Sequence, residues 1–71
     1  MDYEYLTKNN LIVIRRISPD YGCNLSDASI SDIREELLYT YLRAEDESPN
    51  VAREHYFKNL LKELCNRLEK Q

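Results

Sequence analysis

Two cysteines and a single histidine are the side chains of this sequence best suited to nucleophilic or metal chemistry. Catalysis by a Cys/His arrangement needs both groups and an orienting partner in one cleft. Cys23 and Cys65 lie in different segments without a CxxC spacing, and one histidine cannot complete a structural zinc site with them. His55 falls among polar neighbours, so we expect it to be solvated. The sequence therefore predicts no metal, no cofactor and two free thiols that serve packing, with a single disulfide or a reactive thiol as the alternatives.

Acidic residues occur in adjacent pairs, such as Glu35 with Glu36 and Asp46 with Glu47. Paired carboxylates act in catalysis when they converge on one substrate atom, but adjacent helical residues diverge by ~100°. The acidic run 45–47 lacks the spaced oxygen ligands and central glycine of a calcium loop, and the sequence has no Gly-rich phosphate loop. These absences predict a non-catalytic protein.

The chain is small and acidic. Its 71 residues, with a mass of 8.5 kDa, predict a single small domain spanning residues 1–71. The net charge of −3 does not favour binding to nucleic acid or to an anionic membrane surface. The longest apolar run, residues 11–14, is far shorter than the ~20 residues of a membrane span. No signal pattern opens the chain, so we expect a cytoplasmic protein.

The most regular pattern predicts a helix over residues 49–70. Apolar residues from Tyr56 to Leu68 recur at helical spacing on one arc, with polar residues on the other side. Ser48 followed by Pro49 is typical of a helix start, because proline lacks the N–H that the first turn leaves free.

A second helix is predicted over residues 30–44, with Ser29 or Ser26 as its N-cap. Its main apolar stripe comprises Ile30, Ile33, Leu37, Tyr41 and Ala44. Because a short connection links it to the helix over 49–70, the two helices are expected to form an antiparallel αα-hairpin.

The N-terminal part of the chain allows several structures. Residues 11–17 favour a strand, because they begin with a short and mostly β-branched run. We expect it to pair with residues 3–7 in a β-hairpin, while residues 18–27 form a connector. The alternatives are the same strand of a second copy, or one helix over residues 3–17 in an all-α three-helix fold. The predicted fold class is mainly helical α+β.

The predicted helices carry more apolar surface than a two-helix hairpin can cover. We therefore expect the chain to self-associate as a homodimer and to bind another protein through its helix faces, as a small regulatory or inhibitor protein. Six tyrosines support this, because tyrosine is enriched at interfaces. Tyr41 and Tyr56 are expected in the core, and Tyr39 on an exposed acidic face. The predicted interface comprises Asp32, Glu36, Leu38, Tyr39, Leu42, Arg43, Phe57 and Leu61.

A strand followed by two helices resembles the element order of ribbon-helix-helix transcriptional regulators. In that family, paired strands from two subunits enter the major groove and place polar side chains on base edges. The resemblance implies that Arg15 and Arg16 read DNA bases. The long link from the strand to the first helix, the apolar strand and the acidic charge all differ from a compact DNA-binding dimer. DNA binding is therefore the alternative to a role in protein interaction.

Overall fold

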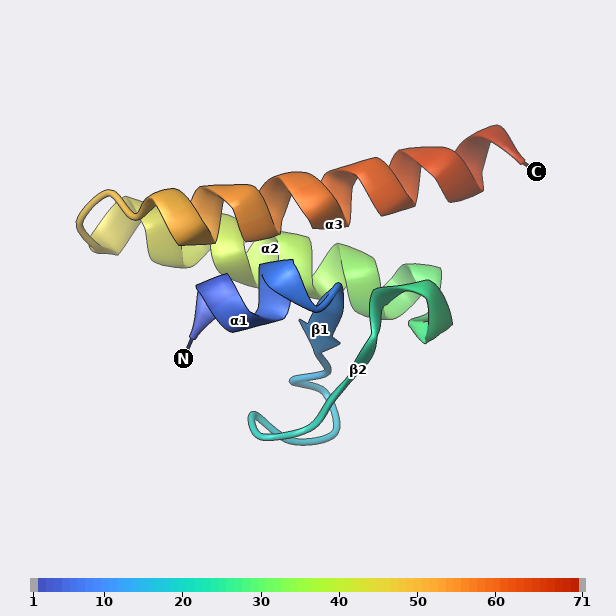
Figure 1. Cartoon of the computed structure of the whole chain (residues 1–71), viewed down its shortest axis with the longest axis horizontal. Helices are drawn as coiled ribbons and strands as arrows, with labels where there is room; N and C mark the ends of the chain where they lie inside the picture. Colours follow the sequence, from blue (N-terminus) through green and yellow to red (C-terminus); the bar gives the residue numbers. More distant parts are fainter. Residues whose placement is uncertain (1, 71) are drawn as a thin grey trace.

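The computed structural model describes residues 2–70 of the chain. The elements, in order, are α1 (Tyr3–Lys8), β1 (Leu11–Val13), β2 (Gly22–Asn24), a 3-10 turn η1 (Leu25–Asp27), α2 (Ile30–Asp46) and α3 (Val51–Glu69). Figure 1 shows α2 and α3 side by side as an antiparallel hairpin, with α1 and the two strands on one side of the pair. The predicted class, mainly helical α+β with a helical hairpin, is confirmed.

The two long helices begin at polar caps. The Ser29 hydroxyl oxygen accepts a hydrogen bond from the backbone N–H of Asp32 at 3.0 Å, as the sequence predicts. The cap of α3 is Asn50, whose side-chain oxygen accepts from the N–H of Arg53 at 3.1 Å. The predicted start at Ser48 and Pro49 is wrong, because the Asn50 side chain satisfies the first turn and leaves Pro49 in the connection.

Residues 3–7 form a helix, and the prediction that they form a strand is wrong. Asp2 caps α1 by accepting a hydrogen bond from the N–H of Tyr5 at 3.1 Å. Tyr3 and Leu6 lie three residues apart, and both bury surface on this short helix. The Tyr3 ring lies 5.3 Å from the ring of Tyr56 on α3. Packing against α3 therefore selects a helix where the sequence alone allows a strand.

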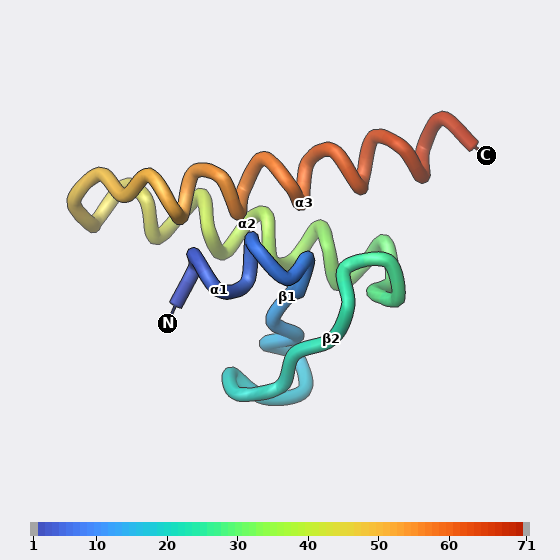
Figure 2. The backbone as a smooth tube through the Cα atoms, viewed as in Figure 1, coloured from blue at the N-terminus to red at the C-terminus, as the bar shows by residue number. Residues whose placement is uncertain are grey.

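The partner of β1 is β2, which lies within the predicted connector. The strands pair antiparallel, with Leu11 opposite Asn24 and Val13 opposite Gly22. A Cβ atom on Gly22 would lie 3.2 Å from the carbonyl oxygen of Ile12, so glycine permits this close pairing. The predicted strand over 11–17 ends at Val13, and Figure 2 shows that the tip of the following loop projects away from the helices. This pairing replaces both the expected partner strand over 3–7 and the strand of a second copy.

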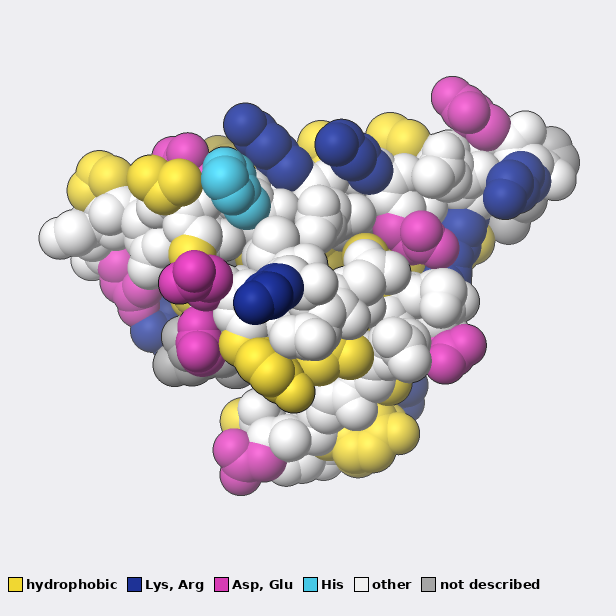
Figure 3. All heavy atoms as spheres, in the orientation of Figure 1, with side chains coloured by type: hydrophobic (Ala, Val, Ile, Leu, Met, Phe, Trp, Pro, Cys, Tyr) yellow, Lys and Arg dark blue, Asp and Glu magenta, His cyan; other side chains and the backbone are white. Residues whose placement is uncertain are grey.

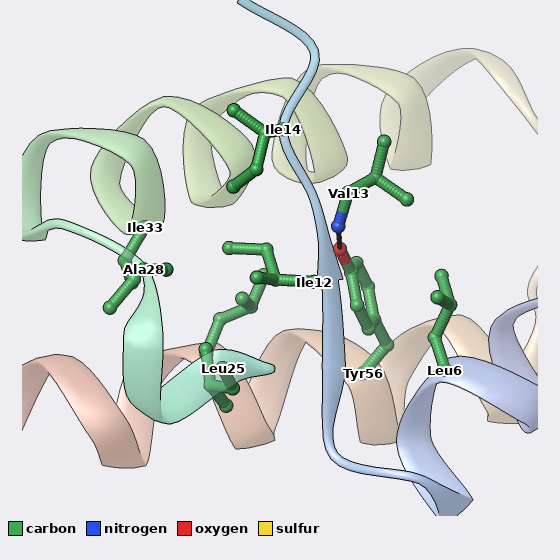
Figure 4. Close-up of a cluster of buried hydrophobic side chains, with 9 residues drawn as sticks. Leu6, Ile12, Val13, Ile14, Leu25, Ala28, Ile33 and Tyr56 are labelled. Carbon is green, nitrogen blue, oxygen red and sulfur yellow. Dashed lines mark hydrogen bonds between the residues drawn. The ribbon is translucent and has the colours of Figure 1, made fainter. Parts of the chain in front are cut away.

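The core lies where the β1 segment passes between the helices (Figure 4). Ile12 is fully buried, and the backbone N–H of Val13 donates a hydrogen bond to the hydroxyl of Tyr56 at 3.2 Å. The predicted core positions Tyr56 and Leu60 are confirmed, at 1% and 0% exposure. The core assignment of Tyr41 is wrong, because this side chain is 55% exposed. The buried side of α2 instead comprises Ile33, Glu36 and Thr40.

Candidate functional site

A cluster of charged side chains connects the β1 segment to α2. The Nε of Arg15 donates to Oε1 of Glu36 at 2.9 Å, and its guanidinium lies 3.7 Å from the centre of the Tyr39 ring. Glu36 is 2% exposed, and its Oε2 is buried without a hydrogen-bond partner within residues 2–70. Burial raises the pKa of Glu36, and the hydrogen bond from Arg15 opposes this shift.

Neighbouring ion pairs complete this charged cluster. Arg16 pairs with Asp32 at 3.0 Å, and this hydrogen bond holds the pKa of Asp32 below its usual value. Arg43 donates to the Tyr39 hydroxyl at 2.7 Å and also pairs with Glu47, whose pKa it lowers. The cluster therefore joins opposite charges and compensates them within the chain.

The structure brings together four of the predicted interface residues, Asp32, Glu36, Tyr39 and Arg43. It does not leave an exposed acidic face, because Arg15 and Arg16 cover Asp32, Glu36 and Tyr39. Glu36 is buried, and Tyr39 is half-buried under the Arg15 guanidinium. The expectation of a projecting Tyr39 is therefore wrong. The two arginines assigned to base reading in the DNA-binding alternative are used in these same ion pairs.

A second surface lies on the helical hairpin, and we call it the open face. On α2, Leu38 is 60% and Tyr41 55% exposed, while on α3 Leu61 is 43% and Leu68 54% exposed. Tyr41 and the half-buried Phe57 line one hollow of about 340 Å³ between the two helices, so the two apolar stripes adjoin. The open face comprises Leu38, Tyr41, Phe57, Leu61 and Leu68.

The sequence predicts part of the open face. Leu38, Phe57 and Leu61 were expected at an interface, and the structure places them on this surface. Leu42, also expected there, is exposed one turn beyond Leu38, where it lines a hollow with Tyr39 and Arg43. Tyr41 was assigned to the core, although its spacing of three residues from Leu38 places both on one side of a helix.

Two arginines have structural roles that the apolar pattern of the sequence does not indicate. Arg53 is 5% exposed, pairs with Glu47 at 2.9 Å and follows the helical spacing of Tyr56 and Leu60, so its burial could have been inferred. Arg67 donates to the carbonyl oxygens of Leu25 and Ser26 at 2.9 Å, and to that of Ala28. No local pattern signals these contacts, because they connect segments far apart in the sequence.

The molecular surface carries both signs of charge. On the side that Figure 3 shows, basic side chains are interspersed with acidic ones. Within residues 2–70, no group of three His, Cys, Asp or Glu side chains is placed to hold a metal ion. None of the helices in this range is long and apolar enough to cross a membrane. Comparisons with protein-family models, curated proteins and solved structures give no match.

Proposed function

We propose that this chain is a non-catalytic interaction module of the small regulatory or inhibitor type, which self-associates through the open face. The observation that carries the proposal is the exposure of large apolar side chains in adjoining stripes on α2 and α3. Contiguous apolar surface of this kind is typical of interaction sites rather than of free surface.

The core of the chain does not use the open face. The buried cluster is formed by α1, β1, η1 and the sides of α2 and α3 that carry Ile33, Tyr56 and Leu60, and it includes none of Leu38, Tyr41, Leu61 and Leu68. Burying apolar area stabilises an assembly by ~25 cal/mol per Å². A second copy would therefore gain stability from side chains that add little to the fold of one chain.

The edges of the open face suit a protein interface. Glu54 and Lys58 line the same hollow as Tyr41 and Phe57, so charged side chains border the apolar centre. An apolar centre within a charged rim is the usual arrangement of such interfaces. The charged cluster around Arg15 supports a non-catalytic role, because its charged groups pair with one another.

The test is the oligomeric state of the full chain, measured by size exclusion with light scattering from ~1 µM to ~500 µM, the range over which dissociation constants of modest interfaces fall. We expect a shift from monomer to dimer mass as the concentration rises. Leu38→Glu should abolish the dimer, because it places a charge in the open face. Ile17→Glu is the matched control, since Ile17 is equally exposed, at 59% against 60%, but lies on the loop after β1. A native chain that stays monomeric, or equal effects of both variants, would overturn the proposal.

A further inference from the structure

The exposed side of α2 carries four residues in one line. Arg34, Leu38, Tyr41 and Glu45 follow one another at intervals of four, three and four residues, and all four are exposed. At ~100° per residue they fall within an arc of ~60° along the helix. Alternating intervals of four and three residues are the pattern with which two helices pack along a common seam.

The two charged ends of this line lack partners within the chain. Arg16, Arg43, Arg53 and Arg67 each form an ion pair with a carboxylate, whereas Arg34 and Glu45 form none within residues 2–70. Neither Arg34 nor Glu45 stabilises α2 through the helix dipole. Glu45 lies in the last turn of α2, where the helix dipole disfavours an acidic side chain, and Arg34 lies close to the first turn, where it disfavours a basic one.

The line is symmetric about the point between Tyr39 and Thr40. If a second α2 packs antiparallel across this point, Arg34 of each copy lies opposite Glu45 of the other. The same arrangement places Leu38 of each copy opposite Tyr41 of the other. In a parallel arrangement Arg34 would meet Arg34 and Glu45 would meet Glu45, so like charges would repel at both ends. The line therefore complements itself in the antiparallel direction alone.

We infer that α2 is the seam of an antiparallel, two-fold symmetric dimer, in which Leu38 packs on Tyr41 and Arg34 pairs with Glu45 across the axis. This inference rests on the proposed function and adds the partner, a second copy, and its register. This register places Leu38 of the second copy opposite Tyr41. Tyr41 lines a hollow together with Ala44 and Phe57, so that Leu38 would lie beside this hollow. A side chain entering such a hollow is the packing that helical seams use.

Charge reversal tests the register directly. Arg34→Glu places two acidic residues opposite each other at both ends of the seam, and Glu45→Arg places two basic ones there. Each variant alone should dimerise about tenfold more weakly than the native chain, or weaker still, with a difference that shrinks at high salt. The double variant Arg34→Glu/Glu45→Arg should recover the native dissociation constant, because the exchanged charges attract again.

Mixing provides the decisive comparison. An equimolar mixture of the Arg34→Glu and Glu45→Arg chains has attraction at both ends, so a heterodimer should form at concentrations where each chain alone is monomeric. Asp20→Arg, a charge reversal on the exposed loop after β1, is the matched control and should change nothing. Circular dichroism of each variant verifies its helix content. Native mass spectrometry separates the heterodimer from the homodimers.

The outcomes separate the register from the proposed function. A native dimer that is insensitive to both reversals, or a mixture that forms no heterodimer, overturns the antiparallel register while self-association remains. A native chain that is monomeric throughout overturns both, and leaves a different protein as the occupant of the open face. Weakening by Asp20→Arg equal to that by Glu45→Arg would also refute the seam, because the effect would then reflect total charge alone.

Discussion

Leu60 and Leu61 are adjacent residues of one type on one helix, and the structure gives them opposite roles. Leu60 is fully buried beside Tyr56, whereas Leu61 is 43% exposed on the open face. Truncation of each to alanine removes the same atoms from the same helix. Helix propensity therefore changes equally in both variants, and any difference between them reports packing alone.

The expected magnitudes differ by several fold. Leu60→Ala removes a completely buried side chain and leaves a cavity, which costs ~2–5 kcal/mol. A chain of this length has a total stability of ~4–10 kcal/mol, so the melting temperature should fall by ~10–30 °C. Leu61→Ala leaves no enclosed cavity and should cost less than ~1 kcal/mol in the monomer. In the dimer it removes apolar contact from both copies, so the dissociation constant should rise by ~5–30-fold.

The assay is urea unfolding followed by circular dichroism, at one protein concentration below the dimerisation range and one within it. Leu60→Ala should lower the free energy of unfolding at both concentrations. Leu61→Ala should resemble the native chain when dilute and should lose the stabilisation that concentration gives to the native chain. Equal losses for both variants in the dilute sample would refute the assignment of the buried and exposed sides of α3.

Four further substitutions test other contacts. Tyr56→Phe should cost ~1–3 kcal/mol in urea unfolding and speed amide exchange at Val13, because the buried N–H of Val13 loses its acceptor; unchanged exchange at Val13 would refute that bond. Glu36→Gln should gain stability relative to the native chain as the pH rises above ~4.3, because the raised pKa of Glu36 makes its ionisation oppose folding. Asp32→Asn should lose stability relative to the native chain as the pH rises towards ~3.9, because Arg16 stabilises the ionised Asp32. Unfolding measured from pH 2 to pH 8 would contradict these causes if the two slopes had the same sign. Arg67→Gln should lower the free energy of unfolding by ~1–3 kcal/mol, because carbonyl groups of the η1 segment lose their donor. Lys58→Gln is the control and should be neutral. Equal stabilities of these two variants would show that the Arg67 contact contributes nothing.

The helical hairpin could be predicted because its signals are local. Ser29 caps α2 through its own neighbour, and Tyr56 and Leu60 follow the period of a helix. The start of α3 was misplaced by two residues, because Ser48 and Asn50 both suit a cap and only the three-dimensional structure decides between them.

The pairing of the strands could not be predicted, because it depends on contacts distant in the sequence. Residues 3–7 become a helix since Tyr3 and Leu6 pack on the core, and β1 then pairs with residues 22–24 within a turn-rich segment. The burial of Glu36 had a local signal, since it lies three residues after Ile33 and four before Thr40. Its partner Arg15 had none, because the loop after β1 brings it to α2.

The sequence predicts an uncovered apolar surface on the helical hairpin, but it identifies only some of the residues of the open face. The width of the apolar pattern on both helices indicates that one hairpin cannot cover it. The exposure of Tyr41 depends on which side of α2 the β1 segment occupies, and that side carries Glu36 and Thr40. A pattern of apolar residues alone places the buried side too close to Tyr41.

The most direct test of the account is a nuclear Overhauser measurement between two copies, in a dimeric sample that mixes isotope-labelled and unlabelled chains. We predict contacts between the methyl groups of Leu38 in one copy and the ring of Tyr41 in the other. Intermolecular contacts that involve Ile17 and the loop after β1, with none at Leu38, would contradict it.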